Sequence, residues 1–261
     1  MRTKAWLFKR SRSVIRALPA RAETVHSFLW LHVLNARDVD EVTLHSYEGP
    51  SGFESEAHNL QPLWAWECSA YEQYFAASNS ILVAGAGGGR EMIALARMGF
   101  QVTGFDASSD LVAACKDNLQ KTNISAETLV ASPAGVPAEC GVHDALVIGR
   151  GVYHHIPGRA RRIRFLQECR KHIKPGAPLV MGDFHTRGDK RPLTAFALSR
   201  KIEEGDAIGD SFFHYFTGHE IKTELEDAGF ELVQFRPTPF PGASLGHATA
   251  NSIRFDEMPL S

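Results

Sequence analysis

Residues 80–91 of the chain read SILVAGAGGGRE, and this stretch decides the fold. A short apolar run breaks into three glycines at alternate positions, Gly85, Gly87 and Gly89, and good helix formers follow over residues 91–96. This order predicts a strand, a tight turn and a helix. Glycine permits positive φ angles and close approach of a ligand, and the first turn of a helix offers free N–H groups. The stretch therefore predicts a site for a nucleotide-like ligand.

The spacing of the glycines bears on which nucleotide binds. The dinucleotide fingerprint has its third glycine at the position that Arg90 occupies here, so the match to it is imperfect. A second strand, residues 101–105, ends at Asp106. A carboxylate at the tip of that strand is placed to accept hydrogen bonds from both ribose hydroxyls of an adenosine. At this point NAD and S-adenosylmethionine both remain open.

Four motifs in order and in register separate these two cofactors. They are VAGAGGGRE at 83–91, GFDAS at 104–108, DALVIGRGVYHHIP at 144–157 and FLQECRKHIKPGAPLV at 165–180. Together they resemble the class I S-adenosylmethionine-dependent methyltransferases, particularly the small-molecule branch, over residues 80–255. The resemblance implies an α/β fold: a doubly wound, seven-stranded, mostly parallel sheet of the Rossmann-like methyltransferase type with a helical N-terminal cap. It also implies methyl transfer from S-adenosyl-L-methionine to a small acceptor.

The resemblance also implies which residues bind the cofactor. The loop with Gly85, Ala86, Gly87 and Gly89 would pass under the methionine part and the ribose. Asp106 would hold the ribose hydroxyls, and Ala107 would line the adenine face. Ser132 stands where the family usually has an acidic residue for the adenine amino group, and a backbone carbonyl is the alternative partner. Arg150 would lie near the methionine carboxylate or the acceptor, unless it forms only a surface charge pair.

The candidates for catalysis are Tyr153, His154 and His155. Histidine titrates near neutral pH and can act as a general base, with His185 and His214 as further candidates. Neighbours in a turn diverge, and in the family pattern the second histidine often packs under the loop. Tyr153 and His154 are therefore predicted to face the substrate. A metal site built from His154, His155, Asp183 and His185 is not predicted, because these residues lack ligand spacing.

The N-terminal part differs in composition from the rest. Residues 1–22 hold seven Lys or Arg and no acid, interleaved with apolar side chains, and no apolar run is long enough for a signal peptide or a membrane span. The pattern favours a solvated basic helix that packs its apolar face on the domain. Contact with a membrane surface or an acidic partner, and a transit peptide, are the alternatives. Candidate pocket residues before the first strand are Tyr47, His58, Trp64 and Trp66.

The remaining elements complete the predicted domain organisation. Residues 1–79 form a helical cap or lid, and residues 80–261 form the cofactor-binding domain with a cap insertion at about 184–216. Helices are predicted over 108–120, 160–172 and 193–204 and from Thr217 onward, and strands over 127–131, 144–148, 178–183, 231–235 and 248–255. Residues 217 and 220 have the spacing of a capping box.

Composition narrows the function further. The net charge of −2 and a pI near 6.6 give no overall basic field for nucleic acid. Four cysteines without paired spacing indicate reduced thiols and a cytoplasmic enzyme. The sequence thus predicts a methyltransferase with S-adenosylmethionine as cofactor, a small-molecule partner and no metal. An NAD-dependent oxidoreductase and a catalytically silent methyltransferase-fold binding module are the alternatives. The acceptor atom and the oligomeric state stay open.

Overall fold

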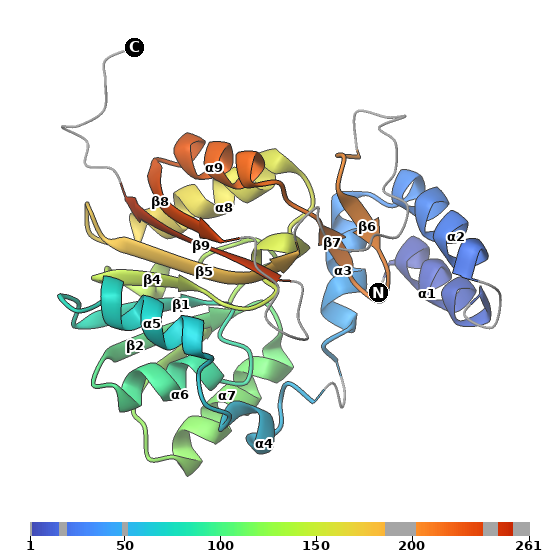
Figure 1. The fold of residues 1–261 in the computed structure, drawn as a ribbon. Helices are drawn as coiled ribbons and strands as arrows, with labels where there is room; N and C mark the ends of the chain where they lie inside the picture. Colours follow the sequence, from blue (N-terminus) through green and yellow to red (C-terminus); the bar gives the residue numbers. More distant parts are fainter. Residues whose placement is uncertain (1, 16–19, 49–51, 186–201, 237–244, 253–261) are drawn as a thin grey trace.

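The computed structural model describes residues 2–15, 20–48, 52–185, 202–236 and 245–252. Its centre is a sheet with the strand order β3-β2-β1-β4-β5-β9-β8 (Figure 1). The strands are β1 Ser80–Ala84, β2 Gln101–Asp106, β3 Glu127–Val130, β4 Ala145–Ile148, β5 Pro178–His185, β8 Phe230–Arg236 and β9 Leu245–Ser252. Strands β1 to β5 pair in parallel, whereas β9 runs antiparallel to both β5 and β8.

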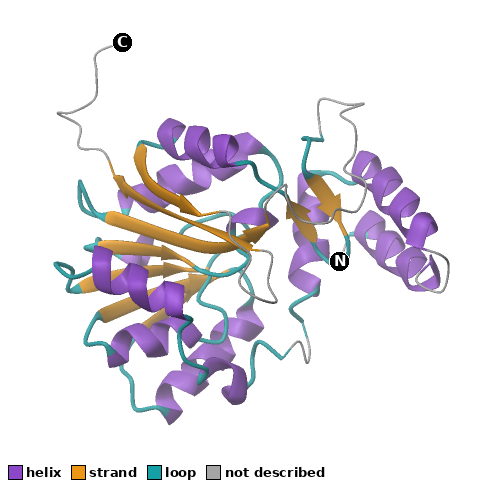
Figure 2. Ribbon diagram, viewed as in Figure 1, coloured by secondary structure: helices purple, strands orange, loops and turns teal. Residues whose placement is uncertain are grey.

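Helices cover both faces of this sheet (Figure 2). Helices α5 Ala65–Tyr74, α6 Arg90–Arg97 and α7 Ser109–Lys121 pack on one face, and α8 Arg159–Lys171 and α9 Gly218–Asp227 pack on the other. Successive residues of a strand point to opposite faces, so Ile81 and Val83 join the first layer while Leu82 and Ala84 join the second. Strand β4 is buried at every position, as expected for a central parallel strand covered on both faces. The predicted doubly wound, mostly parallel sheet is confirmed.

A second cluster lies beside the sheet. It combines α1 Thr3–Ile15, α2 Ala20–Val33 and α3 Ala36–His45 with a hairpin of β6 Asp206–Ile208 and β7 Phe212–His214 (Figure 1). Phe8, Val42 and Phe212 are among the buried side chains that hold this cluster together. The N-terminal helices thus pack on a segment about 200 residues away in sequence. Among the described residues, no helix is long and apolar enough to cross a membrane.

Several predicted boundaries are corrected by the structure. The helix predicted over 193–204 lies outside the described residues up to 201, and residues 202–204 are not helical. The β6–β7 hairpin that follows was missed because its strands have only three residues each. Helix α3 and the short α4 Glu56–Asn59 were not separated from their surroundings. The last strand begins at Leu245 rather than 248, and the predicted end over 253–255 lies outside the described residues. The capping box of Thr217 and Glu220 is confirmed.

Asp144 holds the start of β1 against the start of β4. Its Oδ2 accepts hydrogen bonds from the backbone N–H groups of Asn79 and Ser80, each at 2.9 Å, and Lys174 forms an ion pair with the other oxygen. The hydrogen bond from Lys174, followed by those from the backbone, holds the pKa of Asp144 well below its ordinary value. A carboxyl group whose pKa is lower in the folded than in the unfolded chain stabilises the fold at pH values above its unfolded-state pKa. This stabilisation is lost as the pH falls through its folded-state pKa.

Asp144→Ala is therefore expected to lower the free energy of unfolding by about 1–3 kcal/mol at neutral pH, because charge-assisted hydrogen bonds are lost. The difference from the parent should shrink below about pH 4, where the carboxyl of the unfolded chain is protonated. Urea unfolding at neutral pH and at pH 3 measures both values. Asp117→Ala, at an exposed position of α7, is the matched control. Equal effects of the two substitutions would contradict the assignment.

Candidate functional site

A cavity of about 480 Å³ opens at the carboxyl ends of β1, β2 and β4. Its floor is the glycine loop after β1, and α3 and residues 53–64 close it from the other side. Seven of the eight predicted cofactor residues line it: Gly85, Ala86, Gly87, Asp106, Ala107, Ser132 and Arg150. Open parallel sheets bind their ligands in this position, outside the strand ends where the strand order reverses.

The three glycines of the loop differ in what surrounds the position of a Cβ atom. Gly87 has a φ of +53°, and a Cβ built on it would meet no atom within 4 Å, so a side chain there would project into free space at the cavity. A Cβ on Gly85 would instead lie 1.9 Å from Cγ2 of Val152. Gly89 does not line the cavity. With a φ of +105° it is the N-cap residue of α6, and a Cβ there would lie 2.9 Å from Sγ of Cys115. The role predicted for Gly89 is thus corrected to turn geometry and packing.

Asp106 joins the end of β2 to the glycine loop. Its two oxygens accept hydrogen bonds from the N–H groups of Gly87 and Ser108, each at 2.9 Å. Burial raises the pKa of this carboxyl, and the hydrogen bonds from Ser108 and Gly87 oppose that shift. A carboxylate can accept more than two hydrogen bonds, so Asp106 keeps capacity for a ligand hydroxyl.

Arg90 explains why the loop departs from the dinucleotide fingerprint. Its guanidinium is buried and pairs with Glu67 at 2.5 Å and with Glu91 at 2.8 Å. The guanidinium groups of Arg90 and Arg150 each lie 5.1 Å from the ring centre of Trp64. A glycine at position 90 would remove the cation that neutralises Glu67. The structure thus uses this position to anchor α5 to α6, and Arg90 and Arg150 both line the cavity.

The catalytic candidates occupy a 3₁₀ turn, Tyr153–His155, after β4. His154 and His155 both line the cavity, whereas Tyr153 does not. The prediction that Tyr153 faces the substrate is wrong: the side chain is 2% exposed, and its hydroxyl donates to Glu224 at 2.6 Å. The prediction that His155 packs under the loop is also wrong. The turn directs Tyr153 into the core and leaves both histidines facing the cavity, where their rings contact Phe213.

His155 takes part in a chain of hydrogen bonds that sequence reasoning missed. Its Nδ1 lies 2.5 Å from the carbonyl oxygen of Phe212, and its Nε2 lies 2.8 Å from the hydroxyl of Tyr47. Because a carbonyl oxygen only accepts, Nδ1 carries the hydrogen, and Nε2 of the neutral ring accepts from Tyr47. Burial, followed by the charge of Asp106, raises the pKa of Tyr47 to about 12. The turn after α3, the 3₁₀ turn and β7 thus meet at one imidazole.

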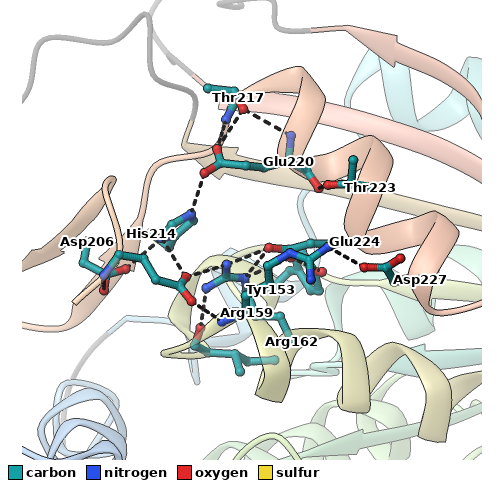
Figure 3. A network of polar contacts seen from close by, with 12 residues as sticks. Tyr153, Arg159, Arg162, Asp206, His214, Thr217, Glu220, Thr223, Glu224 and Asp227 are labelled. Atoms are coloured by element: carbon teal, nitrogen blue, oxygen red, sulfur yellow. Dashed lines mark hydrogen bonds and ion pairs between the residues drawn. The ribbon is translucent and has the colours of Figure 1, made fainter. Parts of the chain in front are cut away.

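A buried ionic network holds the turn from behind (Figure 3). Arg162, on α8, donates to both oxygens of Glu224 on α9, at 2.7 and 3.0 Å, and its Nη2 donates to Glu203 at 2.8 Å. Glu224 also accepts from Tyr153, so the residue next to the two histidines is fixed to two helices. Glu224 and Arg162 are 0% and 1% exposed, so neither charge has water as an alternative partner.

Of the remaining predicted site residues, some line the cavity and others lie in the protein core. His58 and Trp64 line the cavity, as predicted, but Trp66 packs against Gly182, where a Cβ would lie 2.1 Å from Cη2 of the indole. His214 is fully buried, and its Nδ1 lies 2.7 Å from Asp206. Burial, and next the charge of Arg162, lowers the pKa of His214 to about 4. His214 is therefore a neutral structural residue outside the cavity. The side chains of Asp183 and His185 lie outside the described residues.

Among the described residues, one group of side chains has the composition and spacing of a possible metal site. Glu203, Asp206 and His214 bring their ligand atoms within 4.8 Å of one another. The cationic Arg162 already bonds Glu203, and Asp206 is occupied by His214 and by the N–H of Glu203. This donor set is satisfied by protein cations and N–H groups, and it lies outside the cavity.

Comparison with protein families gives a match over the centre of the chain. Residues 81–176 match the family described as "Methyltransferase domain". These residues run from β1 to the loop before β5 and include the glycine loop, Asp106 and the two cavity histidines. A comparison with curated protein sequences found no match.

Several solved structures with a similar fold are methyltransferases by their titles. An S-adenosylmethionine-dependent methyltransferase from Methanosarcina mazei has a TM-score of 0.62 at 22% identity, over 74% of this chain and 99% of that one. A 1,6-didemethyltoxoflavin-N1-methyltransferase from Burkholderia thailandensis has 0.60 at 18%, over 85% and 92%. An amino pentose methyltransferase from Micromonospora echinaspora, with bound S-adenosylmethionine, has 0.58 at 15%, over 77% and 96%. The family match supports the predicted methyltransferase class over residues 81–176, and these structures show that the fold is shared.

The buried network predicts a graded loss of stability. Tyr153→Phe removes one hydrogen bond while Arg162 still satisfies Glu224, so the free energy of unfolding should fall by about 1 kcal/mol. Glu224→Gln leaves a buried guanidinium without its main carboxylate and should cost about 3–5 kcal/mol. Urea unfolding at neutral pH measures both. Glu226→Gln, exposed on the same helix, should stay within about 0.5 kcal/mol of the parent. A loss for Glu224→Gln no larger than this control would refute the network's role.

Proposed function

We propose that the chain, whose residues 81–176 match a methyltransferase domain, transfers the methyl group of S-adenosylmethionine to a small-molecule acceptor bound in the same cavity. The observation that carries this proposal is the composition of the cavity wall. One part is the glycine loop with Asp106, and another is formed by Tyr47, His154 and His155. A single space thus offers both a cradle for a nucleoside and groups that can handle a proton. Its volume of about 480 Å³ is in the range typical of small-molecule sites.

The residues present fit the cofactor. Gly87 has free space where a Cβ would stand, which suits close approach of a ligand to the backbone. Asp106 would accept from the ribose hydroxyls, and Ala107 and Ser132 would lie along the adenine. Arg150 would pair with the methionine carboxylate. Bound S-adenosylmethionine supplies a methyl group activated by a positively charged sulfur, so the protein's task is to orient the acceptor and exclude water.

The acceptor would bind against the side chains that do not belong to the cofactor loop. Tyr47, Phe53, His58, Trp64 and Phe213 make this part of the cavity largely aromatic, with polar edges. Such a lining suits flat or amphipathic molecules. We therefore favour a small aromatic or heterocyclic acceptor over a macromolecule. The division into a cap at 1–79 and a cofactor domain at 80–261 stays a prediction, as does the cytoplasmic location.

Tyr47 and His155 provide a route for a proton if the acceptor is a hydroxyl. The acceptor O–H would donate to the oxygen of Tyr47 while the phenolic proton passes to Nε2 of His155 across the 2.8 Å hydrogen bond. The O–H bond of the acceptor breaks, an N–H bond forms on the imidazole, and Tyr47 replaces the proton it gives to His155 with the proton it receives from the acceptor. Because its pKa is raised to about 12, Tyr47 stays protonated and can pass a proton on at neutral pH. His154, which also lines the cavity, is the direct alternative.

The decisive experiment measures the cofactor and the product separately. Calorimetry with S-adenosylmethionine and with NAD⁺ should give binding of the first only. Incubation with an isotopically labelled methyl donor and a panel of small hydroxylated and nitrogen-containing heterocycles, read by mass spectrometry, should give a labelled small product. Tight NAD⁺ binding without S-adenosylmethionine binding would overturn the proposal in favour of an oxidoreductase. Cofactor binding with label only in protein or nucleic acid would overturn the small-molecule acceptor.

Gly87→Val is expected to weaken S-adenosylmethionine binding by more than 100-fold, because a branched side chain would occupy the space beside the loop. The control is Gly99→Val. Gly99 also has a positive φ, +97°, and open space around its Cβ position, but it does not line the cavity. Both variants should lose similar stability through backbone strain, and only the first should lose affinity in calorimetry. Parental affinity of Gly87→Val would show that the ligand does not approach this loop.

Variants of Tyr47, His154 and His155 distinguish the two candidate bases, His155 acting through Tyr47 and His154 acting directly. With a hydroxyl acceptor, Tyr47→Phe and His155→Ala should each lower kcat by roughly 10² to 10⁴, with S-adenosylmethionine affinity changed less than about threefold. Because the two residues act as one unit, the double variant should be no slower than the slower single variant. His154→Ala should keep most of the activity.

The pH–rate profile supplies an independent readout. The parent should show a limb near the pKa of a histidine, and His155→Ala should lose it. If His154→Ala loses the limb and the rate instead, His154 is the base. With an amine or thiol acceptor that is already nucleophilic, all three variants should stay within about tenfold of the parent.

A further inference from the structure

Helices α1 and α2 form an antiparallel pair at the edge of the molecule farthest from the central sheet (Figures 1 and 2). Lys4 Nζ of α1 donates to the carbonyl of Val33 at the end of α2, and Ser11 bonds His26 at the middle of α2. Phe8 packs between the helices, with its ring 5.4 Å from that of His26. Residues 4, 8 and 11 of α1 therefore mark the side that faces α2.

The inner side of the pair is also defined by contacts. Ala5 and Phe8 of α1 and Leu31 of α2 are buried in the cluster with Val39, Val42, Ile208 and Phe212. This leaves one outer side on each helix, opposite the core. On that side the apolar residues are Trp6, Leu7 and Val14 of α1 and Val25, Leu29 and Val33 of α2, each between 44% and 67% exposed.

Helix periodicity places the exposed apolar residues of α1 and of α2 in two stripes that lie next to each other. Leu7 and Val14 adjoin Lys4 and Ser11 at spacings of three and four, and these two residues face α2. On α2, Leu29 and Val33 adjoin His26 and Trp30 in the same way, and both of those rings contact Phe8 of α1. Each stripe therefore borders the seam between the helices on the side away from the core. The six side chains form one apolar surface, the outer face.

The charge of this part of the chain has the opposite sign to that of the rest. Residues 1–33 contain seven Lys or Arg and one acid, whereas residues 34–261 contain 21 and 29. Arg2 and Arg12 pair with Glu41 and Asp210 within the molecule. Arg10 instead stands on the outer face, 5.5 Å from the ring centre of Trp6 and in the same stripe. The outer face is thus apolar and aromatic and carries the cation of Arg10, while residues 34–261 carry a net charge of −8.

We propose that the outer face of α1 and α2 docks on an anionic lipid surface. Amphipathic helices of this kind lie in the membrane interface, with apolar side chains in the acyl boundary, Trp at the headgroups and Lys or Arg against anionic lipids. The charge asymmetry fixes the orientation, because an anionic surface attracts residues 1–33 and repels the rest of the chain. Docking would leave the cavity on the other side of α3 and requires no segment to span the bilayer.

Vesicle cosedimentation of the full chain tests this proposal. Vesicles of phosphatidylcholine with phosphatidylglycerol should bind at least tenfold more tightly than vesicles of phosphatidylcholine alone, and the difference should shrink as salt is raised. Arg10→Glu should weaken binding to the anionic vesicles by roughly 10- to 30-fold, since each charge near the surface contributes about fivefold. Lys116→Glu, exposed on α7, is the charge-matched control and should bind like the parent.

The apolar contribution has its own pair of variants. Leu7→Ser and Leu29→Ser should each weaken binding at least threefold, whereas Val142→Ser, exposed in the loop before β4, should not change it. Equal binding of both vesicle types, absence of binding at low salt, or insensitivity to Leu7→Ser would each overturn the proposal. So would a lipid-free dimer in analytical ultracentrifugation that Leu29→Ser dissociates, because the face would then belong to a second copy. None of these readouts depends on methyl transfer.

Discussion

The close approach of β1 and β4 is the constraint on which the site depends. The strand order turns from β1 toward β2 and β3 on one side and toward β4 and β5 on the other, so the loops after β1 and β4 leave the sheet side by side. Gly149 donates to the carbonyl of Ala84, and a Cβ on it would lie 2.6 Å from the carbonyl oxygen of Gly85. Only glycine allows this contact. It brings the cofactor loop and the turn with His154 and His155 to one cavity.

The two halves of the cavity are stabilised by different kinds of interaction, local in the cofactor half and long-range in the acceptor half. The cofactor half is local: a buried strand, glycines with positive φ, and Asp106 accepting from the loop it faces. The acceptor half is composite, because the turn after β4 is fixed by Glu224 and Arg162 from α9 and α8 and by Tyr47 and the Phe212 carbonyl. Burying these charges is costly, and pairing them recovers that cost only when every partner is present. The network thus fixes the orientation of the two histidines at a cost in folding free energy.

This difference decides what could be predicted from sequence. Strands β1, β2 and β4, the glycine loop and Asp106 follow from apolar runs and turn residues that are close in the chain. The direction of Tyr153 and His155 does not, since it is set by Glu224 and by Tyr47, 71 and 108 positions away. The β6–β7 hairpin was missed for a related reason: three-residue strands have no readable period, and they are stabilised by packing on α2 and α3. Gly89 was assigned to the ligand because its spacing does not reveal that its Cβ position faces Cys115.

Helix α3 connects the chemistry of the site with the N-terminal helices. One side of it packs through Val39 and Val42 on α1 and the hairpin, and its carboxyl end leads to Tyr47 at the cavity. The position of Tyr47 relative to His155 therefore depends on how the cluster of α1, α2 and β6–β7 seats on the sheet domain. Arg161 and Asp40 fix that seating at the sheet side with two hydrogen bonds, at 2.9 and 3.1 Å. A change in the N-terminal helices can thus alter proton handling in the cavity while leaving the glycine loop and Asp106 unchanged.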